Sequence, residues 1–203
     1  TISLNFIAGD DILNAAEAAA DVAVTGRVGG DAKPGDTVTL TIGSNTYIGE
    51  VQAGNTFSIN VPGGVLAANS SVNASVTATD ENGNSATADT DRGYTVDTEA
   101  EATISLNFIA GDDILNAAEA AADVAVTGRV GGDAKPGDTV TLTIGSNTYI
   151  GEVQAGNTFS INVPGGVLAA NSSVNASVTA TDENGNSATA DTDRGYTVDT
   201  EAE

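Results

Sequence analysis

The sequence predicts an all-β protein built from two tandem sandwich domains. Residues 1–101 recur unchanged as residues 103–203, with Ala102 between them, so the period is 102 residues. A period of this length matches one independent domain and is too long for a solenoid unit. Within each repeat, short runs of alternating apolar and polar residues are separated by clusters rich in Gly, Asn, Asp and Pro, which is typical of short strands. We therefore divide the chain into domains 1–101 and 102–203.

The first half of each repeat alternates strands with turns. Thr1–Ile7 directs Ile2, Leu4 and Phe6 to one face, which predicts a half-buried strand. Asp11–Ala18 combines a residue suited to cap a helix with good helix formers, which predicts a helical turn or two. The strands expected across the repeat are Thr1–Ile7, Asp21–Val28, Thr37–Ile42, Thr46–Val51, Thr56–Val61, Ser70–Thr79 and Ser85–Val96.

The second half of each repeat completes a core of small aliphatic residues. Val65 and Leu66, in the crossing segment after Pro62, are expected to plug one end of the core. Arg92-Gly93 predicts a bulge in the last strand, after which Tyr94 and Val96 return to the inward face. Seven short strands predict an immunoglobulin-like (Ig-like) β-sandwich. If successive strands alternate in direction, the chain enters and leaves each domain at opposite poles, so we expect the domains to follow one another in a cadherin-like end-to-end array. Because the chain has no Cys and no Trp, this thin core is expected to need additional stabilisation.

Composition excludes several functions. Twenty-eight acidic residues against six basic ones give a net charge of −22, so no positive field attracts nucleic acid or an anionic membrane. The chain has no His and no Cys, which removes ordinary zinc sites and thiol or imidazole chemistry. We find no catalytic constellation and predict that the protein is not an enzyme. No apolar run reaches membrane-spanning length, so membrane insertion is not expected.

The acidic residues are expected to collect at the two poles of each domain. If successive strands alternate in direction, the loop Asp10–Glu17 lies at the same pole as the end of the repeat, and the Asp31 loop lies at the other pole with the Asp80 turn. The trailing pole of one repeat then faces the leading pole of the next. Two carboxylates about 4 Å apart repel by roughly 4 kcal/mol at an effective dielectric near 20, and the bridge 97–102 has no basic residue. This argues for a bound cation.

All the candidate ligands are oxygen donors from Asp, Glu and Asn side chains, and such a set favours Ca²⁺. Ca²⁺ is the only cofactor we predict. Asp89 and Asp91 add a candidate site within one domain, whereas the Asp80 turn does not fit an EF-hand loop. The alternative is that these acids are simply solvated surface, which is our preferred interpretation for Asp31, Asp36 and Glu50 taken singly. The candidate ligands are Asp10, Asp11, Asn14, Glu17, Asp80, Asn82, Asn84, Asp89, Asp91, Asp97, Glu99, Glu101, Asp112, Asp113, Asn116, Glu119, Asp133, Asp138, Asp182, Asn184, Asn186 and Asp199.

The most distinctive segments of the repeat are Gly9–Glu17, Val24–Val28, Asp36–Ile42, Asp80–Asn84 and Tyr94–Thr98. Together they resemble the extender-region Ig-like tandem repeats of giant bacterial RTX adhesins. The resemblance covers the whole repeat and implies a protein of the bacterial cell surface, exported by a type I system and folded with Ca²⁺ outside the cell. It also implies that the array holds a distal ligand-binding region away from the cell.

The leading hypothesis is therefore a Ca²⁺-rigidified structural spacer, a monomer whose partners are the neighbouring identical repeats of its own chain. The rival is a module that binds a glycan, a protein or ice. The threonine row Thr37, Thr39, Thr41 and the aromatic Tyr47 are the features that would support it, and a solvated sandwich face explains the row more simply. Homotypic adhesion by contact between strand edges is a third hypothesis.

Overall fold

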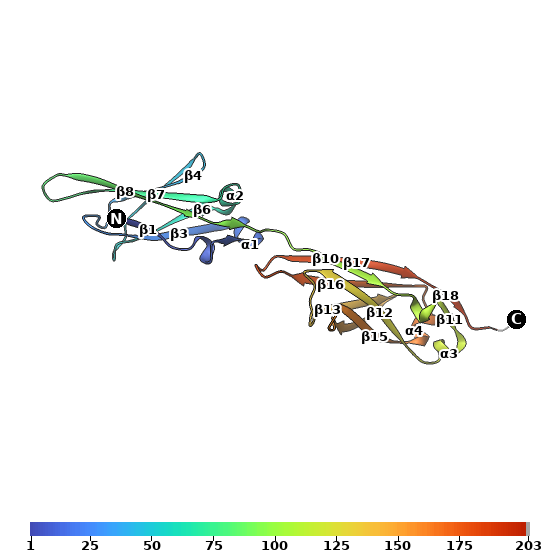
Figure 1. Cartoon of the computed structure of the whole chain (residues 1–203). Coiled ribbons are helices and arrows are strands. Elements are labelled where there is room, and N and C mark those ends of the chain that lie inside the picture. Colours follow the sequence, from blue (N-terminus) through green and yellow to red (C-terminus); the bar gives the residue numbers. More distant parts are fainter. Residues whose placement is uncertain (202–203) are drawn as a thin grey trace. The chain divides into compact units, whose positions relative to one another are not determined.

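In the computed structural model, which describes residues 1–201, the chain divides into two compact units. Unit 1 is Thr1–Thr98 and unit 2 is Glu99–Glu203. Residues 99–101, which the sequence period assigns to the end of the first repeat, thus belong to the second unit. Both units are all-β and consist of the same elements in the same order (Figure 1).

Each unit is a sandwich of a three-stranded and a four-stranded sheet, together with a small parallel pair. In unit 1 the strand orders are β1-β3-β6, β5-β4-β7-β8 and β2-β9. In unit 2 they are β10-β12-β15, β14-β13-β16-β17 and β11-β18. The seven main strands and the sandwich confirm the predicted Ig-like fold.

The elements of unit 1 are β1 (Ile2–Leu4), η1 (Ile7–Gly9), β2 (Ile12–Leu13), α1 (Ala15–Ala18), β3 (Asp21–Val28), β4 (Thr37–Ile42), β5 (Asn45–Glu50), β6 (Thr56–Pro62), α2 (Gly63–Ala67), β7 (Ser71–Thr79), β8 (Ser85–Gly93) and β9 (Thr95–Val96). Those of unit 2 are β10 (Ala102–Leu106), η2 (Ile109–Gly111), β11 (Ile114–Asn116), α3 (Ala117–Ala120), β12 (Asp123–Gly132), β13 (Thr139–Ile144), β14 (Asn147–Glu152), β15 (Thr158–Pro164), α4 (Gly165–Ala169), β16 (Ser173–Thr181), β17 (Ser187–Gly195) and β18 (Thr197–Asp199).

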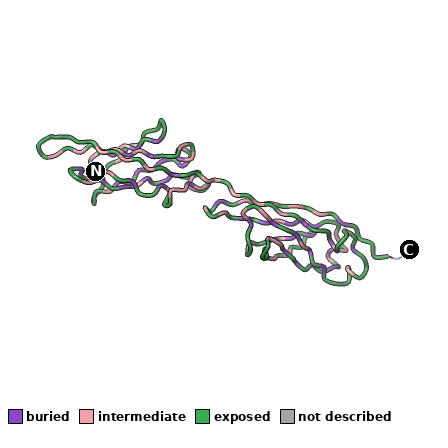
Figure 2. The backbone as a smooth tube through the Cα atoms, viewed as in Figure 1, coloured by how far each residue is buried: buried purple, intermediate pink, exposed green. Residues whose placement is uncertain are grey.

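Alternation along the strands builds one core in each unit (Figure 2). In unit 1 the apolar residues of β3, β4, β6 and β7 face inward, with Phe57 and Leu66 among the fully buried side chains. Leu66 lies on the short helix α2 and plugs the end of the sandwich, as the sequence predicts, whereas Val65 beside it is half-buried. The helix α2 packs so closely against the loop Asp10–Glu17 that a Cβ at Gly63 would clash with the backbone oxygen of Glu17. Gly63 is therefore required for this packing.

The structure corrects the predicted first strand and helical turn. The strand β1 ends at Leu4, and Phe6 is 60% exposed because Ile7, at the start of η1, takes the next core position. Part of the expected helix is the strand β2, so that α1 contains only Ala15–Ala18, capped by Asn14. Ile12 and Leu13 pair with Thr95 and Val96 instead of joining the helix, and sequence periodicity does not show that pairing.

The last strand is also interrupted rather than bulged. The strand β8 ends at Gly93, Tyr94 enters the core, and β9 resumes at Thr95. Tyr94 faces inward as predicted, and its hydroxyl donates to the Leu66 carbonyl at 2.8 Å. Val96 does not face inward as predicted, since 38% of it is exposed. It lies on the two-residue strand that pairs with β2 outside the two main sheets.

Candidate functional site at the poles of each unit

The C-terminal pole of unit 1, defined as residues 10–17 with residues 92–97, is held by a parallel strand pair. β2 and β9 align Ile12 with Thr95 and Leu13 with Val96. The Thr95 N–H donates to the Asp11 carbonyl at 2.9 Å, and the Asp97 N–H donates to the Leu13 carbonyl at 3.0 Å. The first loop therefore lies beside the end of the domain, which is the arrangement that strand alternation predicts.

Arg92 ties this pole to the first strand. Its Nε donates to Asp11 Oδ1 at 2.8 Å, and its Nη2 bonds Asp11 Oδ2 to complete a bidentate ion pair. The guanidinium also lies over the Phe6 ring, 4.4 Å from its centroid, and Nη1 reaches the Leu4 carbonyl at 3.4 Å. Planar guanidinium groups favour this combination of bidentate pairing and stacking. Sequence reasoning missed the cluster, although the lone Arg92 beside a predicted strand break was a usable signal.

Asp11 has the left-handed backbone conformation, with φ of 67°, which aspartate tolerates better than most residues. Its Oδ1 also accepts the Ile7 N–H at 2.8 Å. The hydrogen bonds from Arg92 lower the pKa of the Asp11 carboxyl below its ordinary value, and they raise the pKa of Arg92. Both carboxylate oxygens of this predicted Ca²⁺ ligand are thus bonded to an arginine.

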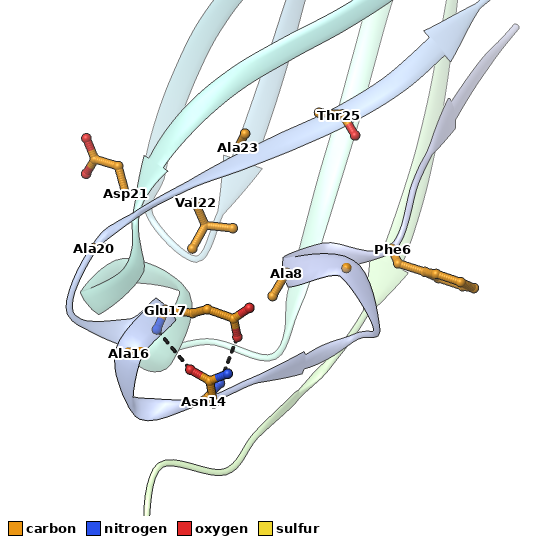
Figure 3. A pocket seen from close by; sticks show the side chains of 11 residues that line it. Phe6, Ala8, Asn14, Ala16, Glu17, Ala20, Asp21, Val22, Ala23 and Thr25 are labelled. Atoms are coloured by element: carbon orange, nitrogen blue, oxygen red, sulfur yellow. Dashed lines mark hydrogen bonds between the residues drawn. The ribbon is translucent and has the colours of Figure 1, made fainter. Parts of the chain in front are cut away.

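Asn14 and Glu17 form a capping box at the start of α1. The Glu17 N–H donates to Asn14 Oδ1, and the Asn14 N–H donates to Glu17 Oε2, both at 3.0 Å (Figure 3). They border an open groove of about 520 Å³ that also contacts Phe6, Asp21 and Thr25. One carboxylate oxygen of Asp10 accepts the Ile12 N–H at 2.9 Å. These polar groups therefore already form hydrogen bonds that hold the conformation of the loop.

The N-terminal pole of unit 1, defined as residues 29–36 with residues 80–84, carries the second acidic group. Lys33 Nζ reaches the Thr79 carbonyl at 3.4 Å, so the Gly29–Asp36 loop lies beside the Asp80 turn as predicted. Asp80 Oδ1 accepts the N–H groups of Asn82 and Asn84, and its Oδ2 accepts the Asn84 side-chain amide at 2.9 Å. These bonds, that from the Asn84 side chain first, lower the pKa of Asp80.

Asp89 and Asp91 occupy alternate positions on β8, where both are exposed. Asp91 accepts a hydrogen bond from the Asn73 amide at 3.1 Å. They share a strand face with the hydroxyl groups of β4 and β7, whose pairing places Thr39 opposite Ser75 and Ser75 opposite Asp89. The threonine row Thr37, Thr39, Thr41 is thus part of a solvent-facing polar sheet surface.

Unit 2 repeats the C-terminal pole closely. Arg194 pairs with Asp113 and stacks over Phe108 at 4.4 Å, and Asn116 and Glu119 form the same capping box. Asp112 accepts the Ile114 N–H at 3.0 Å. Asp199 is the last residue of β18 and aligns with Asn116. The Arg194 hydrogen bonds lower the pKa of Asp113.

The N-terminal pole of unit 2 differs, because the residues before it take part. The Glu101 N–H donates to Asp133 Oδ2 at 2.7 Å, and the Asp133 N–H donates to the Glu101 carbonyl at 2.7 Å. Glu99 begins the same unit, and Asp138 accepts the Lys135 N–H in the adjoining loop. Asp182 binds Asn184 and Asn186 as Asp80 binds its turn, and Asn186 is buried.

The carboxylates of the predicted Ca²⁺ set do not assemble into one ready site. Within residues 1–201, no three or more Asp or Glu side chains gather closely enough to hold a metal ion. The donor chemistry fits a hard cation, since every candidate ligand is an oxygen donor and Ca²⁺ also accepts peptide carbonyls and water. Asp11 and Asp80 fit least well, because both carboxylate oxygens of each already accept hydrogen bonds within the fold.

Two solved structures match the chain over nearly its full length. One, described as a Ca²⁺-stabilised adhesin that helps an Antarctic bacterium reach out and bind ice, is 45% identical over 100% of this chain and 50% of its own, with a TM-score of 0.91. The other, a 1.5-MDa bacterial ice-binding adhesin described in terms of host cell surface retention, is 44% identical over 98% of this chain and 64% of its own, with a TM-score of 0.94. This chain therefore spans only half to two thirds of those structures.

A third structure, an Ig-like domain of the ice-binding adhesin of Marinomonas primoryensis, is 42% identical over 50% of this chain and 100% of its own length, with a TM-score of 0.48. No family model matches the sequence, and no curated protein matches it significantly. Across residues 1–201, none of the helices has the length and apolar character needed to cross a bilayer.

Proposed function

Because this chain belongs to the family of Ig-like tandem extender repeats of bacterial adhesins, we propose that its two units are spacer domains that hold a distal binding region away from a bacterial cell surface. The observation that carries this proposal is the repetition of one complete sandwich, with an unchanged sequence, in a chain that matches tandem adhesin domains end to end. A spacer needs repeated, self-contained units, whereas an enzyme needs one shaped site. Export by a type I system is part of the same proposal.

We also propose that Ca²⁺ stabilises these units. The net charge of −22 opposes compaction, and the acidic groups at the poles repel one another unless a cation neutralises them. At the C-terminal poles we favour Asp10 and Asp97 in unit 1 and their equivalents Asp112 and Asp199 in unit 2 as ligands. At the N-terminal pole of unit 2 we favour Glu99, Glu101 and Asp133. When bound, Ca²⁺ supplies positive charge that the residues of the bridge lack. The residues that bond Arg92 or cap α1 would first have to leave those partners.

A thermal melt with millimolar Ca²⁺ and then with chelator tests this part of the proposal. One site occupied at about one hundred times its dissociation constant adds about 2.7 kcal/mol. For a domain of this size that shift in stability raises Tm by more than about 10 °C. KCl at matched ionic strength is the control, because screening alone relieves some repulsion. An unchanged Tm on chelation would exclude Ca²⁺ support and would leave the spacer role standing.

Neutralised variants locate the ligands. Glu99→Gln with Glu101→Gln should remove most of the Ca²⁺-dependent rise in Tm if the bridge binds the ion. Glu50→Gln with Glu152→Gln, on the exposed strands β5 and β14, removes the same charge elsewhere and should leave the rise intact. Equal responses from the two pairs would show that general charge repulsion, rather than a bridge site, is being relieved.

A further inference from the structure

The two repeats have identical sequences, but the units that contain them have different N-terminal edges. In unit 1 the pairing of β1 with β3 covers Ile2 to Leu4, and it is followed only by bonds between Thr1 and Gly29. In unit 2 the pairing of β10 with β12 continues through Thr103 and Ala102, which align with Gly131 and Gly132. Two further bonds join Glu101 to Asp133, each at 2.7 Å. The additional residues come from the bridge before the second repeat.

The same segment covers apolar surface in unit 2. Ala102 packs against the unit 2 core, and Ala180 is fully buried. In unit 1 the equivalent Ala78 is only half-buried, and it lines an open groove of about 290 Å³ with Thr1, Gly30, Asp31 and Ala86. The groove therefore lies where Ala102 and its neighbours lie in unit 2.

The glycine at the centre of this edge reports the same difference. Gly30 and Gly132 have the same left-handed conformation, with φ of 73° and 71°. A Cβ added at Gly132 would lie 2.4 Å from the Glu101 oxygen, whereas at Gly30 the nearest neighbour, the Thr1 nitrogen, lies 3.9 Å away. The backbone is thus already shaped in unit 1 to receive a segment that only unit 2 holds.

We propose that the groove bordered by Gly30 and Asp31 is a docking surface for the Glu-Ala-Glu-Ala segment that ends an upstream copy of the repeat. The segment continues β1 in the N-terminal direction and pairs its backbone with Gly30 and Asp31, beyond the end of β3, as Ala102 and Glu101 pair with Gly132 and Asp133. It places its alanine over Ala78, and Asp31 accepts its peptide N–H. The tail of each repeat then completes the first sheet of the next. This inference goes beyond the spacer role and does not depend on Ca²⁺, so its tests are run in chelator.

The rate at which a glutamyl endopeptidase cleaves the full chain after Glu101 under native conditions measures how often the docked segment is released. Gly132→Ala should speed cleavage after Glu101 about tenfold, since loss of one or two hydrogen bonds shifts the opening equilibrium by about that factor. Gly30→Ala imposes the same backbone strain without a clash and should leave that rate unchanged. Equal rates in both variants would overturn the proposal.

Two further measurements keep the test decisive if Gly132→Ala unfolds unit 2. Cleavage after Glu119, which lies in the capping box at the C-terminal pole, would then accelerate too, whereas release of the segment alone affects only Glu99 and Glu101. Asp133→Ala removes the acceptor of the Glu101 N–H without altering a glycine, and it should also speed cleavage at Glu101. Its matched control is Asp31→Ala. Unchanged cleavage in Asp133→Ala would contradict the assigned role of that carboxylate.

A chain extended by Asp-Thr-Glu-Ala-Glu-Ala before Thr1 tests the docking surface of unit 1 directly. The added glutamates should be cleaved about as slowly as Glu101, and Gly30→Ala, now placed against the added segment, should make their cleavage about tenfold faster. An extension of Gly and Ser with two glutamates at the same positions should be cleaved rapidly in both backgrounds. Rapid cleavage of the natural segment irrespective of Gly30 would refute docking.

Discussion

The two units share every residue of a repeat, yet their N-terminal poles differ more than their C-terminal poles do. Arg92 with Asp11 and Arg194 with Asp113 make the same ion pair, and both arginines stack on phenylalanine at 4.4 Å. The N-terminal poles differ in strand length, burial and hydrogen bonding. The repeat thus encodes the ion pair and the ring stacking of its C-terminal pole by itself, whereas its N-terminal pole depends on the residues that precede it.

The largest test of this comparison uses the core. Phe57 and Phe159 are each 1% exposed and equivalent, so replacement by alanine should cost either unit about 3–5 kcal/mol. In the Phe57→Ala chain the thermal transition at higher temperature is then the unfolding of the intact unit 2. In the Phe159→Ala chain it is the unfolding of the intact unit 1. We expect the upper transition to be higher in Phe57→Ala, because the docked segment adds bonds to unit 2. Coincident upper transitions in calorimetry would show that the segment adds no stability.

The second prediction concerns Arg92 and Arg194, which make the same contacts at the two C-terminal poles. Arg92→Ala removes a bidentate ion pair, a bond to the Leu4 carbonyl and the stacking on Phe6, and should cost about 1–3 kcal/mol. Arg194→Ala should cost unit 2 the same, since its contacts are the same. Denaturant unfolding measures both values. Arg27→Ala, on an exposed position of β3, is the control and should change stability by less than about 0.5 kcal/mol.

Acid should weaken both units together. The pKa values of Asp11, Asp113, Asp80 and Asp182 are lowered in the folded chain by hydrogen bonds, so folding favours their ionised forms. This stabilisation is fully present above the ordinary aspartate pKa near 3.9 and is lost as pH falls through the lower folded-state values. Urea midpoints measured between about pH 5 and pH 2 in chelator should fall accordingly, and less steeply in Arg92→Ala. A midpoint that stays constant over that range would contradict the assigned hydrogen bonds.

The smallest expected effect is a gain. Ala8 and Ala110 have φ of 57° and 55°, a conformation that glycine adopts without steric cost. Ala8→Gly and Ala110→Gly should each stabilise their unit by about 0.5 kcal/mol, after the greater entropy of the unfolded glycine is subtracted. Ala19→Gly, where the backbone is helical, should instead destabilise unit 1. Chemical denaturation resolves the two signs.

The sandwich could be predicted from the sequence because inward and outward residues alternate within each strand. Val38, Leu40 and Ile42, for example, are all fully buried. The alternating strand directions also placed the Asp10–Glu17 loop beside the end of the domain, which the β2–β9 pair confirms. These features are local, or follow from counting strands.

The parts that could not be predicted depend on contacts between distant residues. Arg92 and Asp11 are 81 positions apart, and no local pattern reveals their bond. Phe6 continues the apolar alternation of the first strand, yet it lies outside because Ile7 fills the core and Arg92 covers the ring. The boundary near Glu99 was equally hidden, since a repeated sequence has the same period wherever its first residue is placed.

The parallel pairing of β2 with β9 determines how a unit resists being pulled from both ends. Tension from the C-terminal side reaches β9 at its last residue, whereas β2 is held from its first residue, because the chain before it is fixed by the pairing of β1 with β3. Because the strands are parallel, these forces slide one strand along the other, and the bonds from Thr95 to Asp11 and from Asp97 to Leu13 are loaded at the same time. An antiparallel pair pulled from one end would open like a zipper, one bond after another. Each unit therefore meets tension in shear, with the Arg92–Asp11 ion pair loaded alongside.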